Sequence, residues 1–170
     1  MSSATTYTCD KCRHRSSLDK VLRIYEGGAK LSVPTNPCWC HNCKDVTWAE
    51  RVPDPEEIRS ELSAWSAGNL EYGYLFVGAP YRKNPRAEAE VPAYLQSLLA
   101  WRLKRQSPSK CFTCGSSRIF LASSPYESLR HPACGGALKP LTSICASIGK
   151  RKVFIYSPEG LKISEFEAIA

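Results

Sequence analysis

The sequence predicts an α+β fold in which two small β units are joined by a mainly helical central segment. Two groups of cysteines mark the units, five within 9–43 and four within 111–145, with none between them. β-Hairpin patterns accompany each group, and two helix patterns lie between the groups. We therefore expect an N-terminal unit over 1–52, a helical linking segment over 53–108 and a C-terminal unit over 109–170.

A β-hairpin is predicted within the N-terminal unit. β-Prone runs at 21–25 and 30–33 flank Glu26-Gly27-Gly28, and glycine tolerates the positive φ that tight turns need. Residues 46–48 can add a third strand.

The central segment opens with a helix start at Asp54-Pro55. The aspartate can accept the first free amide hydrogens, and proline suits the first helical position. Ile58, Leu62 and Trp65 then fall on one face, and Gly68 ends the element.

A second helix is predicted from Pro92 to about Gln106, where Ser107-Pro108-Ser109 breaks it. Between the helices, residues 72–78 fit either a strand or a buried connection. In the C-terminal unit, 116–122 is expected to form a strand after the first cysteine pair. Runs at 153–156 and 161–164 then flank a turn, which predicts a second hairpin.

Composition limits the kind of protein. No run of about 18 apolar residues and no signal peptide is present, so we expect a cytoplasmic protein without membrane spans. The nine cysteines are an odd number, and clustered cysteines in a reducing compartment hold metal more often than they form disulfides. The formal net charge is +7, with the basic surplus beginning near Arg82.

The C-terminal unit carries the clearer metal motif. Cys111 and Cys114 are followed after sixteen residues by His131 and Cys134, which gives C-x2-C-x16-H-x2-C. Two intervening residues let a tight turn aim both donors at one tetrahedral ion, and a following glycine accepts the left-handed backbone that the turn needs. Cys145 is an alternative fourth ligand, but the x2 spacing favours His131 and leaves Cys145 as a small packed side chain.

At this motif the sequence resembles the zinc-ribbon family, whose knuckles commonly read C-P-x-C-G. The stretch HPACG at 131–135 is such a knuckle with histidine in place of the first cysteine. The resemblance implies a small β unit built around a structural zinc ion, and the family serves both nucleic-acid binding and protein docking.

The N-terminal cysteines predict a second zinc site. Cys9, Cys12, Cys40 and Cys43 give C-x2-C-x27-C-x2-C with the hairpin inside the gap. The run WCHNC also matches a thioredoxin-like redox pair, but that motif needs a strand before it and a long helix after it, and the flanking residues are β-prone and proline-rich. Neither knuckle is followed by glycine, which departs from the ribbon form.

Three further side chains lie near this second set of ligands. Cys38 competes with Cys40 but lacks the x2 spacing. His14 and His41 are interpreted as surface residues, because four cysteines already fill a structural zinc site.

The sequence favours a binding protein over an enzyme. Both sites can be filled by four protein donors, whereas catalytic zinc keeps an open position, and no P-loop, G-x-S-x-G or H-E-x-x-H motif occurs. We therefore expect a non-catalytic protein with two Zn²⁺ per chain.

Its partner is expected to be nucleic acid, and the alternative is a protein-docking adaptor. Six cations are the candidate nucleic-acid contacts: Arg102, Lys104, Arg105, Lys150, Arg151 and Lys152. Trp39, Trp48 and Tyr7 could stack on bases, although a small core around zinc is the favoured interpretation. The adaptor alternative relies on the acidic central helix, with Glu56, Glu57 and Glu61 facing a basic partner.

Overall fold

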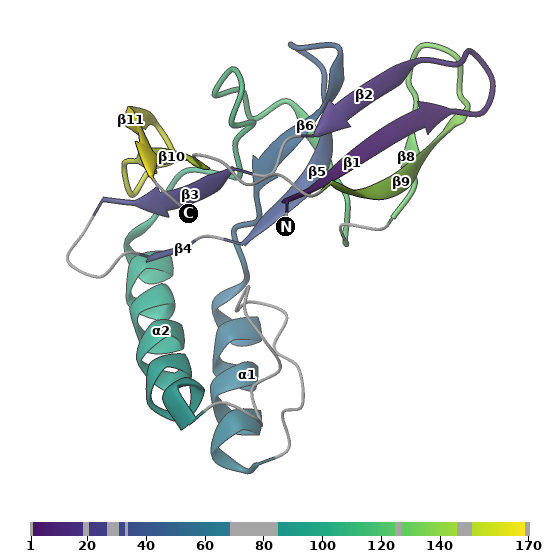
Figure 1. Ribbon diagram of the computed structural model, residues 1–170. Coiled ribbons are helices and arrows are strands. Elements are labelled where there is room, and N and C mark those ends of the chain that lie inside the picture. Colours follow the sequence, from purple (N-terminus) through teal and green to yellow (C-terminus); the bar gives the residue numbers. More distant parts are fainter. Residues whose placement is uncertain are drawn as a thin grey trace.

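The computed structural model describes residues 2–18, 21–26, 31–32, 34–68, 85–124, 127–145 and 151–168. This part of the chain confirms the α+β class, with three sheets and two helices that lie side by side at one end of the molecule (Figure 1). Its elements are β1 (Ser2–Cys9), β2 (Arg15–Leu18), β3 (Leu22–Tyr25), β4 (Leu31–Ser32), β5 (Thr35–Cys40), β6 (Asp45–Glu50), α1 (Pro55–Ser66), α2 (Pro85–Lys104), β7 (Ile119–Leu121), β8 (Leu129–Arg130), β9 (Ala137–Cys145), β10 (Arg151–Tyr156) and β11 (Lys162–Ala168).

Every sheet combines strands from the two ends of the chain. The strand orders are β2-β1-β9-β8, β11-β10-β3-β4 and β6-β5-β7. β1 pairs antiparallel with β9 along its whole length, β3 pairs parallel with β10, and β5 pairs antiparallel with β7. A lone hairpin leaves its apolar face and both of its edges open, and pairing with a distant strand covers one of those edges. Strands of 1–52 and 109–170 therefore share sheets.

The predicted hairpins are present. β3 pairs with β4, with Tyr25 opposite Leu31, although residues 27–30 of the predicted turn lie outside the described part. β10 pairs antiparallel with β11. The predicted third strand is β6, but it pairs with β5 rather than with the β3–β4 hairpin.

The first helix begins and ends as predicted. The Asp54 side chain accepts a hydrogen bond from the Glu56 amide at 2.8 Å, and Pro55 is the first helical residue. After the last helical residue, Ser66, Gly68 has a φ of 70° and donates its amide to the Trp65 carbonyl.

The second helix begins earlier than predicted, at Pro85 instead of Pro92, and ends at Lys104. Residues 86–91 are alanine, valine, arginine and glutamate, of which alanine, arginine and glutamate favour helices, and Pro85 suits the first position. Pro92 therefore lies inside the helix. The predicted strand or connection at 72–78 falls outside the described residues.

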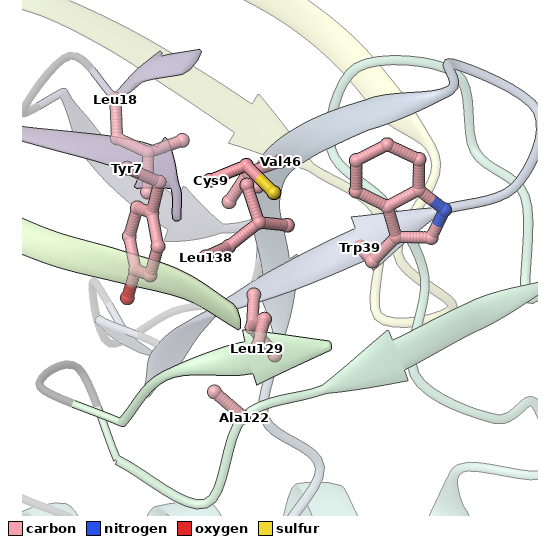
Figure 2. Close-up of a cluster of buried hydrophobic side chains, with 8 residues drawn as sticks. All are labelled: Tyr7, Cys9, Leu18, Trp39, Val46, Ala122, Leu129 and Leu138. Carbon is pink, nitrogen blue, oxygen red and sulfur yellow. The ribbon is translucent and has the colours of Figure 1, made fainter. Parts of the chain in front are cut away.

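Two apolar clusters stabilise the described structure. One lies where the helices meet strands β3 and β10, and its buried members are Tyr25, Ile58, Val91, Leu95, Leu98 and Tyr156. The other lies between the β2-β1-β9-β8 sheet and strands β5 and β6, and Figure 2 shows its members: Tyr7, Cys9, Leu18, Trp39, Val46, Ala122, Leu129 and Leu138. Neither described helix has a stretch long and apolar enough to cross a membrane.

A buried ion pair joins the end of α2 to β6. Arg105 Nη2 lies 2.5 Å from Glu50 Oε2, and the side chains are 1 % and 0 % exposed. The Tyr25 hydroxyl and the Lys110 amide also donate to the Glu50 carboxylate, while Arg105 donates to the Pro158 carbonyl at 3.2 Å. Both oxygens of the Glu50 carboxylate accept hydrogen bonds, so the buried charge is satisfied. The donors come from different elements, and the network therefore connects β3, β6, the end of α2 and the turn after β10.

Candidate metal centres

Four turns with the same backbone carry the predicted metal ligands. In each turn the residue after the second ligand has a positive φ: Arg13 (62°), Lys44 (55°), Gly115 (71°) and Gly135 (67°). The amide of that residue donates to the carbonyl of the first ligand, at 3.2, 2.8, 2.8 and 2.8 Å respectively. The four predicted knuckles are therefore real turns of a single type.

Two of these turns place a cation where glycine is the usual residue. A side chain in the left-handed region costs about 1–2 kcal/mol, which glycine avoids. Arg13 and Lys44 nevertheless adopt the conformation of Gly115 and Gly135. The missing glycines in the N-terminal half therefore do not change the turn geometry.

The eight predicted ligands form two groups, but their pairing differs from the prediction. The outer group is Cys9, Cys12, His131 and Cys134, and the inner group is Cys40, Cys43, Cys111 and Cys114. Within each group the donor atoms all lie within 4.8 Å of one another. The predicted pairing of Cys9 and Cys12 with Cys40 and Cys43, and of Cys111 and Cys114 with His131 and Cys134, is wrong.

Strand pairing explains the nested arrangement. β1 runs antiparallel to β9 with Cys9 opposite Leu138, which brings the turn at 9–13 beside the turn at 131–135. β5 runs antiparallel to β7 with Cys40 opposite Ile119, and Ala49 forms a bridge with Cys111. Each N-terminal turn therefore meets a C-terminal turn. Spacing predicts the turns, but only the sheet decides which two turns meet.

The outer group is compact and partly buried. Cys9 Sγ lies 3.4 Å from Cys134 Sγ, and His131 Nδ1 lies 3.2 Å from both Cys12 Sγ and Cys134 Sγ. His131 is only 5 % exposed. Its ring packs against Trp39 at a centroid distance of 4.9 Å, which holds Nδ1 toward the three sulfurs.

His14 packs beside the outer group without joining it. Its ring stacks on His131 at 5.0 Å, and its Nε2 lies 3.1 Å from Asp45 Oδ1. His41 is exposed, and neither histidine belongs to the two groups found in the described part of the chain.

The inner group consists of four thiols. Cys40 Sγ lies 3.5 Å from Cys114 Sγ, and Cys43 Sγ lies 3.9 Å from Cys111 Sγ. Cys38, which the sequence left as a competitor, is fully buried outside the group. The side chain of Cys145, the other alternative ligand, lies outside the described part.

Thr47 connects Cys38 to the inner group. Its Oγ1 lies 3.1 Å from Cys111 Sγ and 3.3 Å from Cys38 Sγ. The Thr47 hydroxyl can therefore donate a hydrogen bond to the Cys111 sulfur. Sequence reasoning missed Thr47, because its only signal is its place opposite Cys38 on the neighbouring strand.

Hydrogen bonds favour the thiolate form of one ligand in each group. The amide of Cys12 lowers the pKa of Cys9 to about 6. Hydrogen bonds from the side chains of Cys38 and then Thr47 lower the pKa of Cys111 to about 3. Burial raises the pKa of Cys43. Because the thiolate is the form that binds a metal, these hydrogen bonds favour metal binding at Cys9 and Cys111, whereas burial, which raises the pKa of Cys40 and Cys43, opposes it there.

Both groups fit a four-coordinate ion. Metal–sulfur bonds of about 2.3 Å in a tetrahedron place two sulfurs about 3.8 Å apart, and a nitrogen donor shortens that edge slightly. Five of the donor separations lie between 3.2 Å and 3.9 Å, and all donors of a group lie within 4.8 Å of one another. Each group could therefore hold one metal ion with four protein donors.

The predicted nucleic-acid contacts are only partly on the surface. Arg105 is 4 % exposed and paired with Glu50, so its prediction as a surface contact is wrong: the carboxylate draws it into the core. Arg102 is half-buried and donates to the Pro53 carbonyl at 2.8 Å.

The remaining predicted cations differ in what the structure shows of them. Lys104 and Lys152 are exposed. Lys150 and the side chain of Arg151 lie outside the described part. Trp39 and Tyr7 are 5 % and 0 % exposed, which places them in the core and away from any base.

Comparisons with known protein families, with curated proteins and with solved structures find no match.

Proposed function

We propose that the chain is a non-catalytic zinc protein, in which one zinc ion in the outer group and one in the inner group stabilise a nucleic-acid-binding surface. The observation that carries this proposal is the nested arrangement of eight donors in two tetrahedral-sized groups. Each group joins a turn from the N-terminal half to a turn from the C-terminal half, so an ion in it would act as a cross-link.

Zinc suits these donors better than other common ions. Four thiolates, or three thiolates and an imidazole, are typical of structural zinc, whereas magnesium and calcium prefer oxygen. Four protein donors also complete a tetrahedron without water, which is a property of structural sites and not of catalytic ones. A structural zinc ion contributes about 10–16 kcal/mol of apparent binding energy, which is large beside the core of a small β unit.

Charge supports nucleic acid as the partner. The formal net charge is +7, and Lys104 and Lys152 remain available on the surface. Of the carboxylates on which a docking adaptor would rely, Glu57 is paired with Arg51. Glu56 is 78 % exposed and is held only weakly by Arg59 at 3.2 Å. Glu61, the third carboxylate of this set, is 7 % exposed.

Metal content is the first test. Protein purified without added metal should contain about two zinc ions per chain by elemental analysis, since two complete donor sets are present. A ratio near one zinc ion per chain would mean that one of the two groups does not bind zinc. Iron in place of zinc, with the absorbance of a rubredoxin centre, would replace the structural role by electron transfer.

Salt dependence is the second test. If phosphate contacts carry the binding, affinity should fall steeply with added salt. The adaptor alternative expects little nucleic-acid binding and a protein complex that survives nuclease treatment. Affinity weaker than about millimolar for both single-stranded and double-stranded nucleic acid at moderate salt would refute nucleic-acid binding and leave the zinc proposal intact.

A further inference from the structure

The β2-β1-β9-β8 sheet has one buried face and one exposed face. On β2 the residues alternate, with Ser16 and Leu18 buried and Arg15 and Ser17 exposed. The other strands of the sheet alternate in the same way: Tyr7, Cys9, Leu129 and Leu138 are buried, while Arg130, Lys139 and Leu141 are exposed. The buried face covers the apolar cluster in Figure 2, and the exposed side chains of the same strands lie on the opposite face, where Thr6 and Thr8 are half-buried.

Strand register shows which side chains share this open face. Directly opposite residues of antiparallel strands lie on the same face. Thr8 is opposite both Arg15 and Lys139, and Thr6 is opposite both Ser17 and Leu141. Arg130 is opposite Ala137, which shares the face of Lys139. The open face therefore carries Thr6, Thr8, Arg15, Ser17, Arg130, Ala137, Lys139 and Leu141, and we call this set the outward face.

The outward face is cationic. Its charged members are Arg15, Arg130 and Lys139, and no acid is among the eight residues. Lys139 Nζ lies 3.6 Å from Asp10 Oδ2 at the end of β1, but both side chains are well exposed, and a surface pair of this kind holds its lysine weakly. Neither Arg15 nor Arg130 has an ion pair with a described residue.

We propose that the outward face binds the phosphodiester backbone of a nucleic-acid duplex, an inference that rests on the proposed nucleic-acid function. Strands lie about 4.8 Å apart, so Arg15 and Lys139 are separated by about 10 Å with the Thr8 hydroxyl between them. Arginine, lysine and hydroxyl side chains are the usual donors to phosphate oxygens. The row Arg15, Thr8 and Lys139 therefore offers three donors in a line across the sheet.

The residue types on this face favour a duplex over other partners. Proteins that bind single strands stack bases on aromatic side chains, and the outward face carries none. A protein interface would need an apolar centre. Leu141, 69 % exposed, is the one large apolar residue of the set. A duplex exposes its phosphates and keeps its bases stacked inside. It can therefore be bound by a face that carries hydrogen-bond donors and no aromatic side chains.

The test compares two variants of equal charge. The first replaces Arg15, Arg130 and Lys139 by serine. The matched variant replaces by serine three exposed cations that lie outside the outward face and outside the candidate nucleic-acid contacts: Arg59, Arg118 and Lys162. Both variants lower the formal net charge from +7 to +4. Each protein, checked for zinc content and circular dichroism, is titrated with a mixed-sequence DNA duplex of about one to two helical turns and with one strand of it, over a series of salt concentrations.

We expect the outward-face variant to bind the duplex at least about tenfold more weakly near 0.1 M salt, with the salt slope reduced by about 2–3. The matched variant should change much less. Equal losses in the two variants would mean that net charge alone acts, and would overturn the inference. Preferential loss of single-strand binding would overturn the choice of a duplex.

Two other outcomes separate this inference from the proposed function. If the wild-type protein binds neither the duplex nor the single strand, the proposed nucleic-acid function fails, and the inference about the outward face fails with it. If the wild-type protein binds the duplex and the outward-face variant binds it equally well, nucleic-acid binding stands and only the outward face is rejected. The duplex would also be rejected as the ligand of the outward face if the outward-face variant failed to bind an acidic protein partner but kept its affinity for the duplex.

Discussion

The nested pairing of ligands can be tested with paired cysteine substitutions. Cys12 and Cys134 belong to the outer group, and Cys43 belongs to the inner group. Cys12→Ser combined with Cys134→Ser removes two donors of one ion, whereas Cys12→Ser combined with Cys43→Ser removes one donor from each ion. The two double variants lose the same number of thiols and differ only in where the thiols lie.

The structure sets the expected magnitudes. Cys12 Sγ and Cys134 Sγ each lie 3.2 Å from His131 Nδ1, so both would bind the same ion. Cys12→Ser alone should lower zinc from about two to about one per chain, and adding Cys134→Ser should change the zinc content little further. Each lost ion removes on the order of 10 kcal/mol of binding energy, so the stability losses of Cys12→Ser and Cys134→Ser should be strongly non-additive.

Elemental analysis and titration with a chelator measure the outcome. The variant with Cys12→Ser and Cys43→Ser should hold almost no zinc, and the variant with Cys12→Ser and Cys134→Ser should keep about one ion. The reverse result would show that ligands pair within each half of the chain, and would refute the nested arrangement. Cys38→Ser is the control and should retain both ions, because Cys38 lies outside the inner group.

Three further predictions concern single positions. Glu50→Gln should lower the free energy of unfolding, measured by urea titration, by about 3–5 kcal/mol, because it leaves the buried Arg105 guanidinium without its counter-charge. Glu57→Gln is the control: its pair with Arg51 is partly exposed, so the loss should be under about 1 kcal/mol. Both Gly115 and Lys44 have a positive φ, a conformation in which a side chain is strained and glycine is not. Gly115→Ala should therefore lower the free energy of unfolding by about 1 kcal/mol, and Lys44→Gly should not lower it. Equal losses in the two variants would contradict this reasoning. Thr47→Val should shift the charge-transfer bands of the cobalt-substituted inner group while leaving the metal content unchanged, because it removes a hydroxyl 3.1 Å from Cys111 Sγ; an unchanged spectrum would rule out that role.

Local patterns in the sequence predict local structure well. The spacing of two residues between ligands predicted all four turns, and Asp54-Pro55 predicted the start of α1. These features depend on neighbouring residues only, so a single stretch contains the information. The same reasoning failed for α2, where Pro92 resembled a helix start because a proline inside a helix is rare.

Pairing between distant segments could not be predicted in this way. Cys12 and Cys40 are nearer in sequence than Cys12 and His131, yet the β1–β9 pairing brings Cys12 to His131. Arg105 is similar: it belongs to a cationic helix end, which predicts a surface, but its partner Glu50 lies 55 positions away. In each case a contact made by the sheets overrides the local pattern.

The nested order also links the two groups energetically. Cys12 and His131 are separated by 118 residues, and an ion in the inner group shortens the effective loop between them to about 45 residues. Loop-closure entropy then favours the outer group by about 0.9 kcal/mol, roughly fourfold in affinity. Trp39 adds a direct contact, because it precedes the inner ligand Cys40 on β5 and packs on the outer ligand His131 at 4.9 Å. An ion in the inner group would therefore favour the outer group by shortening its loop, and β5 links the two groups directly through the contact of Trp39 with His131.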